Sequence, residues 1–199
     1  MWTADYLKDR VEPHGFRLFG ITLATSAESA TAVYSTFSNL ASQVIVIPAG
    51  HLTARVGGRS VLALGFLVGG ASLAPLALTT RFSLVLAFGV LGGAGGGLVA
   101  GAMGAISAQV LPSAENSARD MNILQTGPVF GQMALTAGGG VMIAWLGKRF
   151  SPSLAWSAMW LVCAAFYVLA LPALIPIRPQ PKPSPGVARY RALDYRRGY

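Results

Sequence analysis

The sequence predicts an all-α integral membrane protein with about five transmembrane helices. Only 11% of the residues are charged and 53% are hydrophobic, whereas soluble domains carry about 25% charged residues. Long stretches without charge recur along the 199 residues, and each is long enough to cross a bilayer. The few charged residues stand in short clusters between these stretches. This alternation is typical of a multi-pass membrane protein.

The chain begins with a mixed segment and a polar first span. Residues 1–28 read as the end of a preceding helix followed by an external loop, and they lack the basic start and apolar core of a signal peptide. We expect the first span at residues 29–50, because no charged residue lies between Glu28 and Arg55. This span is the least apolar of the five, so we expect one of its faces to contact protein or water rather than lipid.

Four more spans follow along the chain. They are predicted at residues 60–79, 82–111, 121–146 and 154–177. Arg81 closes the second span, Pro112 ends the third, and Asp120 is placed to cap the fourth. Residues 178–199 then form a basic, Pro-rich tail, which cannot bury a core and is expected to be disordered. The spans make the lipid bilayer an expected partner of the chain.

The distribution of basic residues predicts the orientation. Six of the fifteen Lys and Arg residues lie in the tail after Pro176. Together with Arg55, Arg59 and Arg119 they place nine basic residues on the tail side of the membrane and six on the other side. Because cytoplasmic segments are enriched in Lys and Arg, we expect a cytoplasmic C-terminus in a protein of the inner cell membrane.

Glycines of the third span recur four residues apart. The pairs are Gly92 with Gly96, Gly93 with Gly97, and Gly97 with Gly101. Such spacing lines a helix face that another helix can approach closely, so we expect tight packing there. The alternative that stays open is a glycine-lined helix that slides or bends during a transport cycle.

Two of the predicted spans carry polar side chains at helical spacing. The first span has Ser35, Asn39 and Gln43, and the fourth has Asn122, Gln125, Gln132 and Thr136. Two polar stripes among otherwise apolar helices predict a shared aqueous cavity. Its candidate residues are Asn39, Gln43, Asn122, Gln125 and Gln132. Hydrogen bonding between helices, worth about 1 kcal/mol or less per pair, is the alternative reading.

Residue patterns for catalysis or cofactor binding are absent from the sequence. The glycine-rich third span lacks the Gly-x-x-x-x-Gly-Lys pattern of a phosphate loop. His14 and His51 have no carboxylate or thiol companions and Cys163 is the single cysteine, so no metal site is predicted. The basic residues form no patch on a soluble domain, which argues against nucleic-acid binding. We predict a protein that is not an enzyme and needs no cofactor.

The most specific motif joins the first two spans. Residues 48–62 read Pro-Ala-Gly-His-Leu-Thr-Ala-Arg-Val-Gly-Gly-Arg-Ser-Val-Leu. The stretch resembles the cytoplasmic loop signature of the major facilitator superfamily, Gly-x-Leu-x-Asp-Arg-x-Gly-Arg-Arg. The matching residues are Gly50, Leu52, Arg55, Gly57 and Arg59. Ala54 stands at the acidic position and Gly58 at the first of the closing basic pair, which resembles the weaker copy between the family's eighth and ninth helices.

The resemblance implies a partial transporter fold. The five spans then correspond to helices eight to twelve, and the first residues to the end of helix seven. Residues 118–121, Ala-Arg-Asp-Met, resemble the start of helix eleven in sugar-transporter-like members. The resemblance implies transport of a small-molecule solute by alternating access, with the N-terminal half of the transporter on another chain or lost. A non-transporting membrane scaffold or assembly factor built on the same helices is the alternative.

Overall fold

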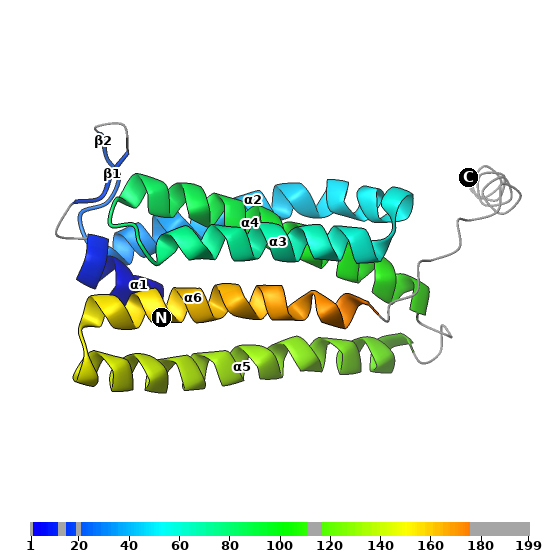
Figure 1. Cartoon of the computed structure of the whole chain (residues 1–199). Helices are drawn as coiled ribbons and strands as arrows, with labels where there is room; N and C mark the ends of the chain where they lie inside the picture. The colour runs from blue at the N-terminus through cyan, green and yellow to red at the C-terminus, as the bar shows by residue number, and fades with distance from the viewer. Residues whose placement is uncertain (1, 12–14, 19–20, 111–116, 176–199) are drawn as a thin grey trace, which may run out of the picture.

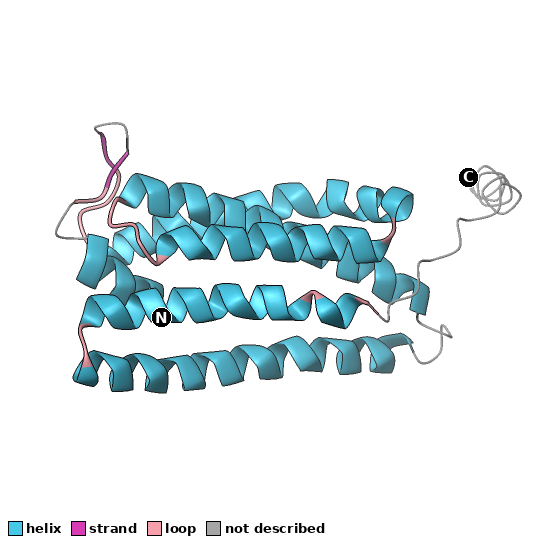
Figure 2. Ribbon diagram, viewed as in Figure 1, coloured by secondary structure: helices cyan, strands magenta, loops and turns pink. Residues whose placement is uncertain are grey.

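Five long helices form a bundle, described by a computed structural model over residues 2–11, 15–18, 21–110 and 117–175. In chain order they are α2 (Ala27–Val56), α3 (Gly58–Leu76), α4 (Phe82–Val110), α5 (Ser117–Arg149) and α6 (Pro152–Ala170). Figures 1 and 2 show the helices side by side, with the turns gathered at the two ends of the bundle. This architecture agrees with the all-α membrane fold that the sequence predicts.

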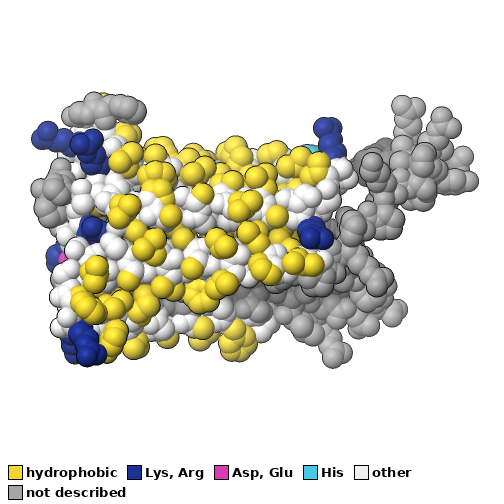
Figure 3. All heavy atoms as spheres, in the orientation of Figure 1, with side chains coloured by type: hydrophobic (Ala, Val, Ile, Leu, Met, Phe, Trp, Pro, Cys, Tyr) yellow, Lys and Arg dark blue, Asp and Glu magenta, His cyan; other side chains and the backbone are white. Residues whose placement is uncertain are grey.

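Four of the helices are long and apolar enough to cross a membrane. These segments are Gly58–Leu76, Phe82–Ser107, Val129–Arg149 and Ser153–Ala170. Helix α2 has 30 residues, but its polar side chains keep it below the hydropathy that the other four reach. In Figure 3 hydrophobic side chains run along the visible flank, and Lys and Arg side chains stand at its two ends. A lipid-facing flank between charged ends is the pattern of a membrane protein.

The N-terminal segment folds at one end of the bundle. A short helix, α1 (Trp2–Tyr6), continues into a π-helical turn, η1 (Leu7–Val11). Two short antiparallel strands follow, β1 (Arg17–Leu18) and β2 (Ile21–Thr22). We call this end of the bundle, where the α3–α4 turn also lies, the hairpin end, and the opposite end, at Gly57, the signature end. The sequence predicted the helical start, whereas strands of two residues are too short to leave a pattern.

Helix α4 is wedged between α2 and α3, and its glycines allow the contact. A side chain at Gly93 or Gly97 would collide with the backbone carbonyl of Ser38 or Ser42 in α2. Gly101 continues the row: a Cβ there would stand 2.6 Å from the carbonyl oxygen of Val46. The partners advance in the same direction along both chains, so α2 and α4 run parallel. The glycine spacing therefore marks backbone-to-backbone packing, as in small-residue motifs of membrane helices.

The other side of α4 meets α3 in the same manner but with opposite polarity. A Cβ at Gly95 would lie 2.7 Å from the backbone nitrogen of Gly69 and 3.0 Å from the carbonyl oxygen of Gly65. Gly92 faces Ser72, further towards the end of α3, so the partners advance in opposite directions and α3 is antiparallel to α4. Glycine on both helices allows an approach that larger residues would prevent.

The last long helix ends earlier than the predicted span of residues 154–177. Helix α6 stops at Ala170, and a single 3₁₀ turn, η3 (Pro172–Leu174), follows it. Proline has no backbone N–H and its ring collides with the carbonyl four residues before it, so Pro172 prevents the α-helix from continuing. The predicted tail, residues 178–199, lies outside the described residues.

The glycine packing predicts a contrast between two neighbouring substitutions. Gly97→Ala should lower the stability of the detergent-solubilised protein by about 1–3 kcal/mol, because the new methyl group meets the α2 backbone. Gly96→Ala should leave it unchanged or raise it by up to about 1 kcal/mol, since Gly96 is helical and nothing from the rest of the structure lies within 4 Å of the added carbon. Thermal unfolding followed by tryptophan fluorescence measures both. Equal unfolding temperatures for the two variants would contradict the packing.

Candidate functional site

The signature motif folds as a sharp turn rather than as the loop that the sequence predicts. Helix α2 continues to Val56 and α3 starts at Gly58, so Gly57 alone separates them. Its φ of 90° and ψ of 145° lie in a region that is almost confined to glycine. Its backbone N–H donates to the carbonyl oxygen of Thr53 at 3.0 Å and closes the last turn of α2. One positive φ is therefore enough to reverse the chain.

The second half of the motif is held against neighbouring helices. A Cβ at Gly58 would lie 2.6 Å from the Cδ1 atom of Ile106 in α4, so a side chain at this position, where the family has a basic residue, would require Ile106 to move. Arg59 donates from Nη1 to the carbonyl oxygen of Ile175 at 3.4 Å. Ile175 directly follows η3, so this bond joins the start of α3 to the end of the α6 segment. The motif thus ties three helices together at the signature end.

In the first half of the motif, the side-chain positions of Gly50 and Arg55 have free space around them. Arg55 is exposed in the last turn of α2, where its charge is favourable to the helix dipole. Within the described residues its side chain makes no hydrogen bond or ion pair. Gly50 has no atom within 4 Å of an added Cβ. Arg55 is therefore available to contact a headgroup or another part of the protein.

The polar stripe of α2 lies on a face that its neighbours leave uncovered. Asn39 and Gln43 are both exposed. The adjacent face of the helix, at Ser38 and Ser42, is the one that packs on α4. Since α2 runs from residue 27 to residue 56, the two amides flank its midpoint and stand far from both ends. Their position suits the middle of a membrane-crossing helix.

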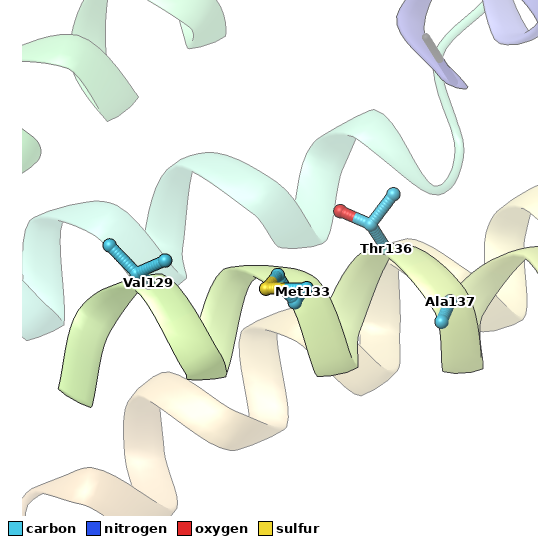
Figure 4. A pocket seen from close by; sticks show the side chains of 4 residues that line it. All are labelled: Val129, Met133, Thr136 and Ala137. Carbon is cyan, nitrogen blue, oxygen red and sulfur yellow. The ribbon is translucent and has the colours of Figure 1, made fainter. Parts of the chain in front are cut away.

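Helix α5 presents a shallow depression along one face. It has a volume of about 430 Å³ and is lined by Val129, Met133, Thr136 and Ala137 (Figure 4). Of the predicted cavity residues in this helix, Asn122, Gln125 and Gln132 have side chains that lie outside the described part of the structure. By helical periodicity their positions fall on the same stripe as the lining residues. The depression therefore follows the predicted stripe.

The two stripes do not pack against each other within the described residues. Helix α2 packs on α4 and, more lightly, on α3, whereas the main packing partner of α5 is α6. Figure 1 shows α5 at one edge of the bundle and α2 on the far side of α3. Among the described residues, Asn39 and Gln43 make no hydrogen bond to α5. The shared aqueous cavity stays a prediction.

A cluster of hydrogen bonds at the hairpin end, which we call the clasp, was not predicted from the sequence. It is formed by Tyr6, Asp9, Arg10, Trp156 and Ser157. The Tyr6 hydroxyl donates to the carbonyl oxygens of Leu76 and Thr79, at 2.9 and 3.2 Å. The Tyr6 ring is fully buried and stands edge-on to Trp156 and Trp160. Burial raises the pKa of Tyr6 to about 12, although the nearby Arg10 lowers it in part. The phenol therefore remains a donor throughout the physiological pH range.

Two charged side chains complete the clasp. Arg10 donates from Nη1 to the carbonyl oxygen of Ala77 at 2.8 Å and to the hydroxyl of Ser157 at 2.9 Å. Trp156 donates from Nε1 to the Asp9 carboxylate at 3.0 Å. The clasp thus joins the N-terminal segment to the end of α3 and the start of α6. The only feature of the sequence that pointed to the clasp was the amphipathic character of residues 2–11.

Comparison with known families decides the class of this protein. The family model described as Major Facilitator Superfamily matches residues 15–193. The chain belongs to the major facilitator superfamily. Its members are transporters, which agrees with the signature turn and the apolar helices. Searches of curated proteins and of solved structures gave no match to this major facilitator chain.

Metal ligands and cysteines are sparse in the described residues of this major facilitator protein. No group of three or more His, Cys, Asp or Glu side chains that could hold a metal ion occurs among them. Cys163 is half-buried in α6 and forms no disulfide. The site candidates are therefore the signature turn and the open faces of α2 and α5.

The signature turn predicts a difference between its two matched glycines. Gly57→Ala should lower the stability of the protein by about 1–3 kcal/mol, because alanine is strained at this backbone conformation. Gly50→Ala should leave stability unchanged or raise it by up to about 1 kcal/mol, since Gly50 is helical and unobstructed. Thermal unfolding in detergent compares them. A Gly57→Ala variant as stable as the parent would show that the turn is not fixed by this residue.

Proposed function

We propose that this chain moves a small solute across the inner cell membrane by alternating access, as the C-terminal helical unit of a major facilitator transporter. Family membership supports transport, and the signature turn supports assignment to the second of the family's two repeated halves. In that assignment α2 to α6 are helices eight to twelve, and α1 with η1 is the end of helix seven.

The single observation that carries the proposal is the exposure of Asn39 and Gln43 near the middle of α2. Transfer of an amide from water to hydrocarbon without a hydrogen-bond partner costs about 4–8 kcal/mol. Two such groups at the middle of a helix therefore require water or a polar partner beside them. Helices α3 and α4 cover other faces of α2. An aqueous solute pathway would supply water as the hydrogen-bond partner of these two amides.

The open face of α5 would form a second wall of the pathway. Val129 and Met133 are more than half exposed, at 54% and 63%, although they stand on a membrane-crossing helix. Gln125 and Gln132 occupy the same stripe and would add amides to the apolar lining. A mixture of apolar surface with a few polar groups is typical of small-molecule sites. We infer that α2 and α5 would face one pathway from its two sides.

The residue types favour a neutral solute. Asp and Glu are absent from the middles of all five long helices; Glu28 and Asp120 stand in first turns. Amides offer both hydrogen-bond donors and acceptors without a net charge. They suit hydroxyl-rich or zwitterionic compounds better than ions. The stretch at residues 118–121 that resembles sugar-transporter-like members points in the same direction.

A membrane scaffold or assembly factor is the second candidate. The buried Tyr6 of the clasp and the close packing of α4 are compatible with it, because both would hold a static platform together. A neighbouring reading frame that encodes six further helices would support the transporter. Water access to the α2 and α5 faces separates the two functions directly.

Cysteine accessibility tests the pathway. In a Cys163→Ala background, Asn39→Cys, Gln43→Cys, Gln125→Cys and Gln132→Cys should react with a membrane-impermeant thiol reagent in intact cells. Leu67→Cys is the control, because Leu67 is 53% exposed on the apolar membrane-crossing helix α3. We expect the four test positions to react about ten-fold faster than the control, since the reactive thiolate requires water. Glucose or glycine betaine should slow the labelling if either resembles the solute.

Equal labelling at the test and control positions would reject an aqueous pathway and leave the stripes as contacts with lipid or protein. Fast labelling that no neutral solute slows, in cells that also lack uptake, would favour the scaffold. The two functions therefore give different results with the same set of variants.

The orientation is tested by reporter fusions. We infer from the positive-inside rule and the resemblance of the signature turn that Arg55, Arg59 and the C-terminus lie in the cytoplasm. A fluorescent protein fused after Tyr199 should fluoresce, and alkaline phosphatase inserted after Thr80 should be active outside. The insertion point lies in the α3–α4 turn at the opposite end of the bundle. Alkaline phosphatase activity at the C-terminus would reverse the assignment.

A further inference from the structure

We propose that an anionic phospholipid binds in the groove at the α3–α4 turn, with its phosphate at Arg81 and an acyl chain across Leu78, Leu84 and Phe88. The groove has a volume of about 430 Å³ and also includes Pro75 and Thr80. It lies at the hairpin end, away from the signature turn and from the α5 depression. The inference rests on residence in a membrane and is independent of the transport proposed above.

The groove is formed by a turn that several backbone hydrogen bonds hold in place. The N–H groups of Leu78 and Thr79 donate to the carbonyl oxygen of Pro75, at 3.1 and 3.0 Å. Arg81 donates its backbone N–H to the Thr79 hydroxyl at 3.4 Å and accepts from the N–H of Leu84 at 3.1 Å. Because these bonds fix the backbone, the groove exists before any ligand arrives. Preorganisation of this kind favours binding.

The apolar part of the groove is unusually exposed. Leu78 is 82% exposed, the highest value among the large hydrophobic side chains that the structure describes. Leu84, one turn into α4, is 43% exposed. Both lie beside the ends of membrane-crossing segments, α3 ending at Leu76 and α4 starting at Phe82. A hydrocarbon chain that runs down from the interface would cover this surface.

The polar part of the groove carries an uncompensated positive charge. Arg81 is exposed, and its guanidinium makes no hydrogen bond or ion pair with the described residues. The acids described at the hairpin end are Asp5, Asp9 and Glu28, and none of them forms an ion pair with Arg81; Asp9 accepts from Trp156. Lys148 and Arg149 add positive charge at the same end of the bundle, where Figure 3 shows several basic side chains. A phosphate would find a partner here and meet little repulsion.

The spacing of the two parts favours a lipid over a soluble anion. Leu78 and Arg81 belong to one turn and line the same groove, so the charge and the exposed hydrocarbon surface lie close together. A phospholipid likewise joins a phosphate to hydrocarbon chains. Free phosphate would use Arg81 alone and leave Leu78 uncovered. The charge of Arg81 further favours a lipid with net negative charge over a zwitterionic one.

Native mass spectrometry of the full chain, released from neutral detergent, tests the site. Phosphatidylglycerol should bind with about five-fold higher affinity than phosphatidylcholine of the same chain length. Arg81→Gln should abolish this preference. Arg149→Gln is the matched control, because Arg149 is an exposed arginine at the same end whose guanidinium lies 5.5 Å from the Trp145 ring centre, outside the groove. That variant should retain the preference.

The acyl contact is tested separately. Leu78→Ala should weaken binding of both lipids about two-fold to five-fold without changing their ratio, since the lost surface is apolar. Leu67→Ala, on the exposed face of α3, should have no effect on either lipid. A preference for phosphatidylglycerol that survives Arg81→Gln would overturn the proposal. So would displacement of the lipid by millimolar inorganic phosphate, because the chains would then contribute nothing.

Discussion

The close approach of backbones along α4 is the constraint on which the rest of the bundle depends. In lipid no hydrophobic force drives helices together, so packing has to come from contact area and shape. Glycines give α4 two flat edges, one for α2 through Gly93, Gly97 and Gly101, and one for α3 through Gly95. The register of these contacts makes α2 parallel to α4 and α3 antiparallel to both. It also decides which face of α2 is covered by protein and which stays open. The exposure of the α2 amides therefore follows from the glycine register.

The two ends of the bundle are closed by different chemistry. At the hairpin end, Tyr6 and Arg10 bind backbone carbonyls that the end of α3 leaves unpaired, and Trp156 packs over them. At the signature end, apolar side chains of four helical segments form a small core around Ala49, Val61, Leu62, Ala102 and Leu174. Over its described residues, α5 is the least buried of the four apolar helices, and its main packing partner is α6. The bundle is therefore packed most closely around α4 and more loosely at α5.

Many features of this fold follow from local sequence patterns, and the features that were not predicted have specific physical causes. Charges and prolines located the long helices, because an uncharged stretch of sufficient length has few other stable states in a bilayer. The four-residue glycine spacing predicted tight packing, but nothing in the spacing identifies Ser38 or Gly69 as the partner. The motif at residues 48–62 was predicted as a loop because it resembles a loop signature of the family, whereas one positive φ at Gly57 suffices for the reversal. The clasp escaped prediction because Tyr6 binds a carbonyl 70 residues away. A local pattern cannot show such a contact.

The outward faces of the bundle divide into two kinds, and this division connects the two proposals. The exposed large residues of α3 and α6 are hydrophobic, including Leu64 and Leu67 on one helix and Phe166 and Leu169 on the other. Helix α2 instead exposes amides among its apolar side chains. A helix that faced only lipid would gain nothing from amides at its middle, and a pathway wall made only of leucine would not bind a polar solute. The apolar faces thus suit lipid, and the Arg81 groove lies where such a face reaches the interface. The mixed face suits water and solute. One bundle can serve both because α4, packed between α2 and α3, holds the two faces apart.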